Sequence, residues 1–194
     1  TEVRINESLP VVKLSEKQNN KNVFGVISNE EDNDNERGFG NGIFESVQIK
    51  VNENEQRMYV NSVGEGGIWV MNTNGNIEKG DYITSCKISP GYGRKQNDDL
   101  LHNYTVAKAT CDCDFSLKTI PVKELKCKYI NGKRHIDYSN GISFENTNNT
   151  SLKYKTRFFN REGQNIQYSE YKKLIENNKR AYIACFIGCT YHCG

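Results

Sequence analysis

The strongest constraint on the fold is a series of short runs in which apolar and polar residues alternate, separated by clusters of glycine, asparagine and aspartate. Alternation with a period of two is the pattern of a strand that buries one face. Gly and Asn clusters supply the backbone conformations that turns require. The runs are PVVKLS (10–15), VFGVIS (23–28), IFESVQIKV (43–51), RMYVNSV (57–63), GIWVM (67–71), DYITS (81–85) and YTVAKAT (104–110). The sequence therefore predicts a mainly β chain.

One segment near the C-terminus departs from this alternation. SEYKKLIENNK (Ser169–Lys179) places Tyr171, Leu174 and Ile175 at helical spacing, and Ser169 can cap the first turn. The following AYIACFIGCTY (181–191) returns to a strand pattern. We therefore expect a single β-rich domain with one short helix near the C-terminus.

Three segments differ in pattern along the chain. Residues 1–115 predict a β-rich core, residues 116–153 a variable β-hairpin insertion, and residues 154–194 a Cys-rich strand-helix-strand segment packed on the same domain. Within the insertion, YINGKRHIDY predicts a hairpin that turns at Asn131-Gly132, and NTNNTS predicts a loop. SPGYGRK (89–95) also predicts a loop, because it lacks the spacing of a phosphate-binding loop. A chain of 194 residues can bury a core without disulfides or metals.

Charge and hydropathy exclude two classes of partner. Lys and Arg total 26 and Asp and Glu total 24, so the net charge is +2 and no strong field attracts nucleic acid or an anionic membrane. No stretch approaches the roughly 18 apolar residues that span a bilayer. We expect no nucleic-acid partner, no membrane insertion and no cofactor. The sequence begins at Thr1, which predicts a fragment or a processed product.

The densest polar cluster is KQNDDLLHNYTVAK (95–108), which contains Asp98, Asp99 and His102. These side chains could form an acid–base group or bind a metal. The alternative is a turn before the strand NYTVAK, with Asp98 or Asp99 capping a helical turn. No nucleophile accompanies His102, so the sequence favours the turn and predicts no catalytic residue.

Seven cysteines form a second candidate group: Cys86, Cys111, Cys113, Cys127, Cys185, Cys189 and Cys193. No CxxC pair is present, which argues against a four-cysteine zinc ribbon. Cys111 and Cys113 share a face if they lie on a strand, so they cannot bond each other without distortion, and each can meet a cysteine of the C-terminal tail.

The tail cysteines Cys185, Cys189 and Cys193 lie four residues apart, which puts them on one face of either a strand or a helix. Three readings stay open: disulfides, buried free thiols, and a zinc site completed by His192. The zinc reading requires a bend, because His192 and Cys193 are adjacent and adjacent strand residues point to opposite faces. We expect structural thiols or disulfides at Cys111, Cys113, Cys185, Cys189 and Cys193, and no metal.

Three blocks carry a resemblance to a known family: VNSVGEGGIWVMNTNGNIEKGDYITS (60–85), GYGRKQNDDLLHNYTVAKAT (91–110) and YIACFIGCTYHCG (182–194). In this order they resemble the intramolecular-chaperone autoproteolytic cleavage domain, a glutamic-type peptidase family, of phage neck and tail appendage proteins, in the branch found in large DNA viruses. The similarity covers about Ile5–Phe115 and Tyr154–Gly194. Residues 116–153 match no pattern of the family.

The resemblance implies a C-terminal, β-rich, trimer-forming module of a virion fibre, spike or appendage that assembles with other virion proteins. Phage members cut themselves from the shaft at a Ser-Asp bond, using that Asp and a Glu three residues later. This chain contains no Ser-Asp dipeptide and no Asp followed three residues later by Glu. The cleavage apparatus therefore cannot be assigned to any residue of this sequence.

Three functions follow as hypotheses. The first is a trimerising structural module at the virion surface. The second is an autoproteolytic domain whose cleavage site lies upstream of Thr1. The third is a tip that binds a host receptor or glycan, for which the signals are the eleven Tyr and the single Trp69. A shallow groove lined by exposed Tyr and Trp69 would favour the third hypothesis.

Overall fold

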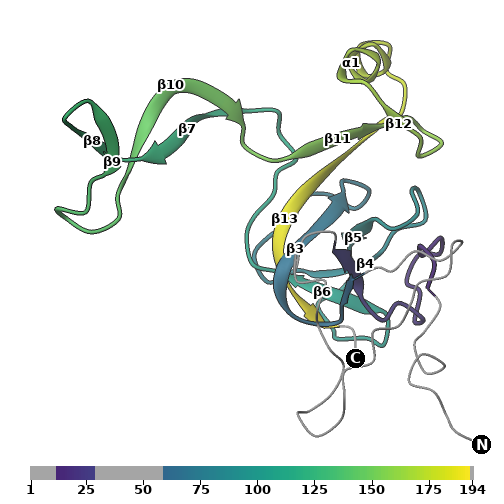
Figure 1. Cartoon of the computed structure of the whole chain (residues 1–194). Coiled ribbons are helices and arrows are strands. Elements are labelled where there is room, and N and C mark those ends of the chain that lie inside the picture. The colour runs from purple at the N-terminus through teal and green to yellow at the C-terminus, as the bar shows by residue number, and fades with distance from the viewer. Residues whose placement is uncertain (1–11, 29–58, 193–194) are drawn as a thin grey trace, which may run out of the picture.

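The computed structural model describes residues 12–28 and 59–192, which form a mainly β fold with a single helix near the C-terminus, as the alternation predicts (Figure 1). The strands are β1 (Val26–Ser28), β2 (Tyr59–Asn61), β3 (Val63–Met71), β4 (Tyr82–Ser85), β5 (Gly93–Lys95), β6 (Thr105–Ala109), β7 (Thr119–Leu125), β8 (Cys127–Ile130), β9 (Lys133–Ile136), β10 (Phe144–Leu152), β11 (Thr156–Phe159), β12 (Asn165–Ile166) and β13 (Tyr182–His192), and the helix is α1 (Tyr168–Glu176). Within these residues, no helix is long and apolar enough to cross a membrane.

The main sheet has the strand order β12-β11-β13-β3-β5-β4-β6, and β6 pairs in turn with β13. Strands β13, β3, β5, β4 and β6 thus form a closed, barrel-like ring, which we call the closed sheet. All of its pairs are antiparallel except β3 with β5. Closure leaves each of these strands with a partner on both sides and so removes the open edges that invite aggregation.

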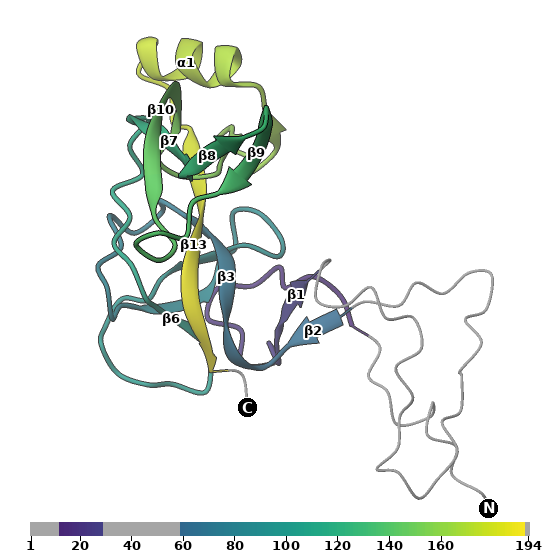
Figure 2. The ribbon, with the colours of Figure 1, turned by 60° about the vertical axis from the view of Figure 1, so that its left-hand side comes forward.

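Strand β13 holds the closed sheet together. Along almost its whole length it pairs with β3, from Ala184 opposite Met71 to His192 opposite Val63. On its other edge, its first residues pair with β11 and its last residues pair with β6. The two figures show β13 running from the upper part of the molecule, beside β11, down to the closed sheet (Figure 2).

The two faces of β13 bury against different cores. Ile183, Cys185, Ile187, Cys189 and Tyr191 belong to the first core, together with side chains of β3, β4 and β6. The alternate residues Tyr182 and Ala184 belong to a second core with Met71, Cys86 and Phe159. Tyr182–Cys185 are buried on both faces, whereas Phe186 and His192 of the second face are exposed. A stretch buried on both faces is expected to be a continuous apolar run, and YIAC is such a run.

Residues 119–152 form an arm outside the closed sheet. Strands β7 and β10 pair only with each other, and β8 and β9 form a nested hairpin. The turn of that hairpin is Asn131-Gly132, as predicted, and both residues have positive φ (50° and 75°). Figure 1 shows the arm reaching away from the closed sheet, and its side chains are mostly exposed.

Several sequence expectations differ from the structure. SPGYGRK is not only a loop, because Gly93–Lys95 form β5, which lies between β3 and β4 and pairs with both. NTNNTS lies within β10, where Asn146, Thr150 and Ser151 pair with β7, while residues 147–149 between them have no paired residue there and form a register shift.

The helix begins at Tyr168 rather than Ser169 and ends at Glu176. Gln167 is the N-cap and forms no side-chain capping bond, so Ser169 lies inside the first turn. Tyr171 contacts Phe158 of β11 (ring centroids 4.9 Å apart), and no residue of the helix is buried.

The predicted strand at 43–51 lies outside the described residues, and residues 12–15 of the predicted strand at 10–15 are not in a strand.

Two glycines allow a matched test of how tightly the turn between β11 and β12 packs. Gly163 and Gly75 share a φ of +79°, but a Cβ at Gly163 would collide with the carbonyl oxygen of Ile88, whereas a Cβ at Gly75 meets nothing within 4 Å. We expect Gly75→Ala to lower the free energy of unfolding by about 1–2 kcal/mol, because alanine is strained in the left-handed backbone conformation. Gly163→Ala should lower it by about 1–3 kcal/mol more, because its Cβ also overpacks the turn. Equilibrium urea unfolding measures both, and equal losses would contradict the predicted close packing.

Candidate functional site

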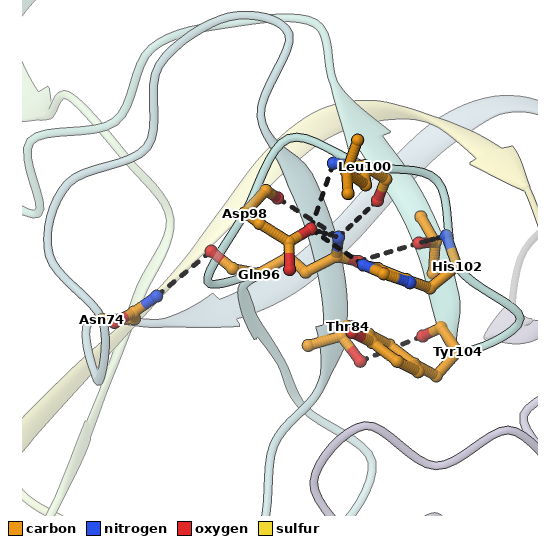
Figure 3. A network of polar contacts seen from close by, with 8 residues as sticks. Asn74, Thr84, Gln96, Asp98, Leu100, His102 and Tyr104 are labelled. Carbon is orange, nitrogen blue, oxygen red and sulfur yellow. Dashed lines mark hydrogen bonds and ion pairs between the residues drawn. The ribbon is translucent and has the colours of Figure 1, made fainter.

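The predicted cluster at residues 95–108 is organised around a buried amide. Gln96 is only 2% exposed, and its Nε2 donates to the carbonyl of Leu100 (2.6 Å) and to Oδ1 of Asp98 (3.0 Å). Its Oε1 accepts a hydrogen bond from the Thr105 hydroxyl (2.8 Å). The backbone carbonyl of Gln96 accepts another from Asn74 (3.2 Å). Figure 3 shows these side chains converging on one loop between β5 and β6.

Asp98 ties the same loop together from its surface. Its Oδ1 accepts hydrogen bonds from the Leu100 N–H (3.1 Å) and from Gln96, and lies 2.9 Å from Nε2 of His102. The His102 ring also stacks on Tyr104, with centroids 4.6 Å apart. Asp99 is exposed and takes no part in this network. The structure therefore brings Asp98 and His102 together and leaves Asp99 outside.

The electrostatics of this cluster suit a structural loop. The Leu100 N–H, followed by His102, lowers the pKa of the Asp98 carboxyl from its ordinary value. A carboxylate whose pKa is lowered is a poorer base, and its oxygen Oδ1 is already bonded to groups of its own loop. These contacts support the turn interpretation over the acid–base interpretation. Among the described residues, no cluster of three or more His, Cys, Asp or Glu side chains could hold a metal ion.

Sequence reasoning missed Gln96, which is the centre of this network. A glutamine in a polar run carries no periodic signal, so burial at this position is decided by the folding of the loop over β4 and β6. The only available hint was its position directly after the GRK segment that forms β5 and before two aspartates. Its buried amide satisfies the polar groups that the loop would otherwise leave unpaired.

The buried cysteines lie in the two cores. Cys113, Cys185 and Cys189 are buried in the first core, and Cys86 is buried in the second core. Cys185 and Cys189 thus lie on the same face of β13, at the spacing that the sequence showed. Cys193 lies outside the described residues, so the tail triplet is seen only in part.

Cys113 and Cys185 meet inside the first core. The neighbouring Cys113 thiol, together with burial, raises the pKa of Cys185. Both residues are 0% exposed and neither forms a disulfide. The structure therefore joins a residue of the 111–113 pair to a residue of the tail, in the form of neighbouring free thiols.

Cys111 lies in a different environment from Cys113. Cys111 is exposed and lies in a bend at residues 110–111 instead of a strand, so the spacing of two does not place it beside Cys113. Only residue 113 pairs, through an isolated bridge to Ile77. Cys127 of the arm is half-buried and free.

The fold and these sites define a mainly β protein built on a closed sheet, with a thiol-containing core and a projecting arm. Comparisons of the chain with family models, curated proteins and solved structures found no match.

We expect Asp98→Ala to destabilise the protein at neutral pH, since the loop would lose three hydrogen bonds, and Asp99→Ala to leave stability nearly unchanged. Because folding lowers the pKa of Asp98, its contribution is fully present above the unfolded pKa of about 4 and is lost as pH falls through the folded value. The stability difference between wild type and Asp98→Ala should therefore shrink below about pH 4. Thermal melting from pH 7 to pH 3 measures this, and a constant difference would contradict the role assigned to Asp98.

The thiols should differ in reactivity according to their burial. We expect iodoacetamide to label Cys111 rapidly in the native protein, and to label Cys86, Cys113 and Cys185 only after unfolding, because alkylation needs an accessible thiolate. Peptide mass spectrometry after timed labelling reads each site. Labelling of Cys185 as fast as Cys111 under native conditions would contradict its placement in the core.

Proposed function

We propose that this chain is a structural and assembly module, a trimerising intramolecular-chaperone-like domain of a virion fibre, spike or appendage protein. Its partners would be two further copies of itself and other virion proteins, and its place the virion surface. The proposal starts from the resemblance of three sequence blocks to the chaperone domains of phage appendages.

The observation that carries the proposal is where these blocks lie in the fold. The first block (60–85) contains β3 and β4, the second (91–110) contains β5 and β6, and the third (182–194) contains β13. These are the five strands of the closed sheet. The residues that resemble the phage family therefore make up one complete structural unit. This is expected if the resemblance reflects a shared module.

The arm supports an assembly role from a separate observation. Large apolar side chains are exposed on it: Ile120, Tyr129, Ile130, Tyr138, Ile142, Phe144 and Leu152. A two-stranded ribbon is at best marginally stable in water, and this one leaves these large apolar side chains in contact with solvent. These side chains would gain stability from burial against another chain.

Autoproteolysis is not proposed for these residues. The chain lacks the Ser-Asp bond and the Asp/Glu pair that the phage members use. Asp98, the most engaged carboxylate of the predicted cluster, is bonded within its own loop.

The proposal predicts the mass of the particle in solution. Light scattering after size exclusion should give three times the chain mass of 22.2 kDa. Reductant should leave it unchanged because the proposed contact is made by apolar side chains of the arm and needs no disulfide. A dilution series serves as the control for weak association. A single-chain mass at every concentration would refute the trimerising function.

A further inference from the structure

A group of aromatic and cationic side chains covers the outer face of the sheet where β11, β13, β3 and β5 meet. We call it the aromatic–cation patch, and it consists of Trp69, Tyr92, Lys155, Arg157 and Phe186. Trp69 and Phe186 have ring centroids 5.5 Å apart, and Trp69 and Tyr92 lie 6.3 Å apart. No side chain of the patch was singled out by the sequence except Trp69.

Strand register explains why these side chains gather. Phe186 of β13 is directly opposite Trp69 of β3, and its N–H bonds to the carbonyl of Lys155. In the next row, Arg157 is opposite Ala184. Because alanine is small, Arg157 can reach across it to the aromatic rings.

The neighbouring row on the other side of Phe186 consists of two glycines, Gly67 and Gly188, which are paired with each other. A Cβ at Gly67 would collide with the ring of Phe186, so this ring lies over the glycine backbone. The arrangement holds Phe186 flat against the sheet and leaves it 43% exposed. A flat, exposed aromatic ring on a rigid strand is a ready contact surface.

Arg157 is held in place before any ligand arrives. Its guanidinium carbon lies 4.3 Å from the centre of the Trp69 ring, and Nη1 donates a hydrogen bond to the Tyr92 hydroxyl (2.7 Å). The Tyr92 ring is itself fixed by edge-to-face contact with Phe159. A stacked and anchored guanidinium loses little conformational entropy when its remaining N–H groups bind an anion.

The charges of the patch have no counter-ions in the described part of the chain. Neither Arg157 nor Lys155 takes part in any of the ion pairs formed among residues 12–28 and 59–192. Lys155 instead lies over Phe186, with Nζ 5.9 Å from the ring centre. Two exposed cations, beside the exposed ring of Phe186 and the half-buried rings of Trp69 and Tyr92, therefore present donors and positive charge to solvent.

We infer that the aromatic–cation patch binds an acidic carbohydrate, namely a sugar ring that carries a carboxylate or sulfate group. The apolar C–H face of a pyranose matches the flat ring of Phe186, and the anionic group matches the guanidinium of Arg157, which binds planar oxyanions in bidentate geometry. Lys155 adds a second charge on the same side. The surface is an open sheet face, which suits a ring lying on it. This inference does not depend on the number of chains in the particle.

The single tryptophan makes the inference directly measurable, because Trp69 is the only one in the chain. We would titrate the full chain with a glucuronic-acid disaccharide, its sulfated counterpart and its neutral counterpart, and follow Trp fluorescence. We expect saturable binding of at least one acidic sugar, at least about tenfold tighter than the neutral one, a difference of about 1.4 kcal/mol. Binding of the acidic sugars no tighter than the neutral sugar, or no binding of any, would overturn the inference.

Variants identify the site. Arg157→Ala and Phe186→Ala should each weaken binding about tenfold or more, whereas Arg161→Ala, which removes the same charge from an exposed turn, should change it less than about twofold. Arg157→Lys keeps the positive charge and serves as the test variant if Arg157→Ala fails to fold. We expect it to lose affinity clearly as well, because an ammonium group cannot stack on the ring or bind an oxyanion in bidentate geometry. Equal losses in Arg157→Ala and Arg161→Ala would show unspecific charge attraction and reject the site. Binding of a glutamate-rich peptide as tight as that of the acidic sugars would reject a carbohydrate ligand.

Discussion

The structure depends on the pairing of β13 with three other strands. Its contact with β3 runs nearly the full length of both strands, and its contact with β6 closes the sheet into a ring. Since β13 and β3 are far apart in the sequence, closure depends on a long-range contact between them. On the edge away from β3, β13 also pairs with β11, which follows the arm and precedes the helix in the sequence.

Because successive side chains of β13 point to opposite faces, its thiols and its exposed aromatic ring lie on different sides of the sheet. On the inner face, Cys185 and Cys189 pack among aliphatic side chains, and Cys185 keeps its proton because Cys113 and burial raise its pKa. On the outer face, Tyr182 and Ala184 pack in the second core, whereas Phe186 is 43% exposed beside the half-buried rings of Trp69 and Tyr92. The inner face and the first part of the outer face stabilise the fold, and the outer face is open to solvent at Phe186.

The loop between β5 and β6 and the arm differ in how far their side chains are satisfied within one chain. In the loop, Gln96 and Asp98 satisfy backbone groups, so a polar segment becomes a fixed structure. In the arm, exposed apolar side chains lie on strands that pair only with each other. The loop is complete within one chain, whereas the arm is the part that would benefit from a neighbour.

The sequence by itself determined the mainly β character, the single helix, the Asn131-Gly132 hairpin and the spacing of the tail thiols, because these follow from local periodicity and turn chemistry. Only the tertiary structure decided that GRK is a strand, that NTNNTS pairs, and that Gln96 is buried. It also decided that Cys113 meets Cys185 and that Arg157 stacks on Trp69. Each of these depends on which distant segments become neighbours, and a local pattern carries no record of strand order or register.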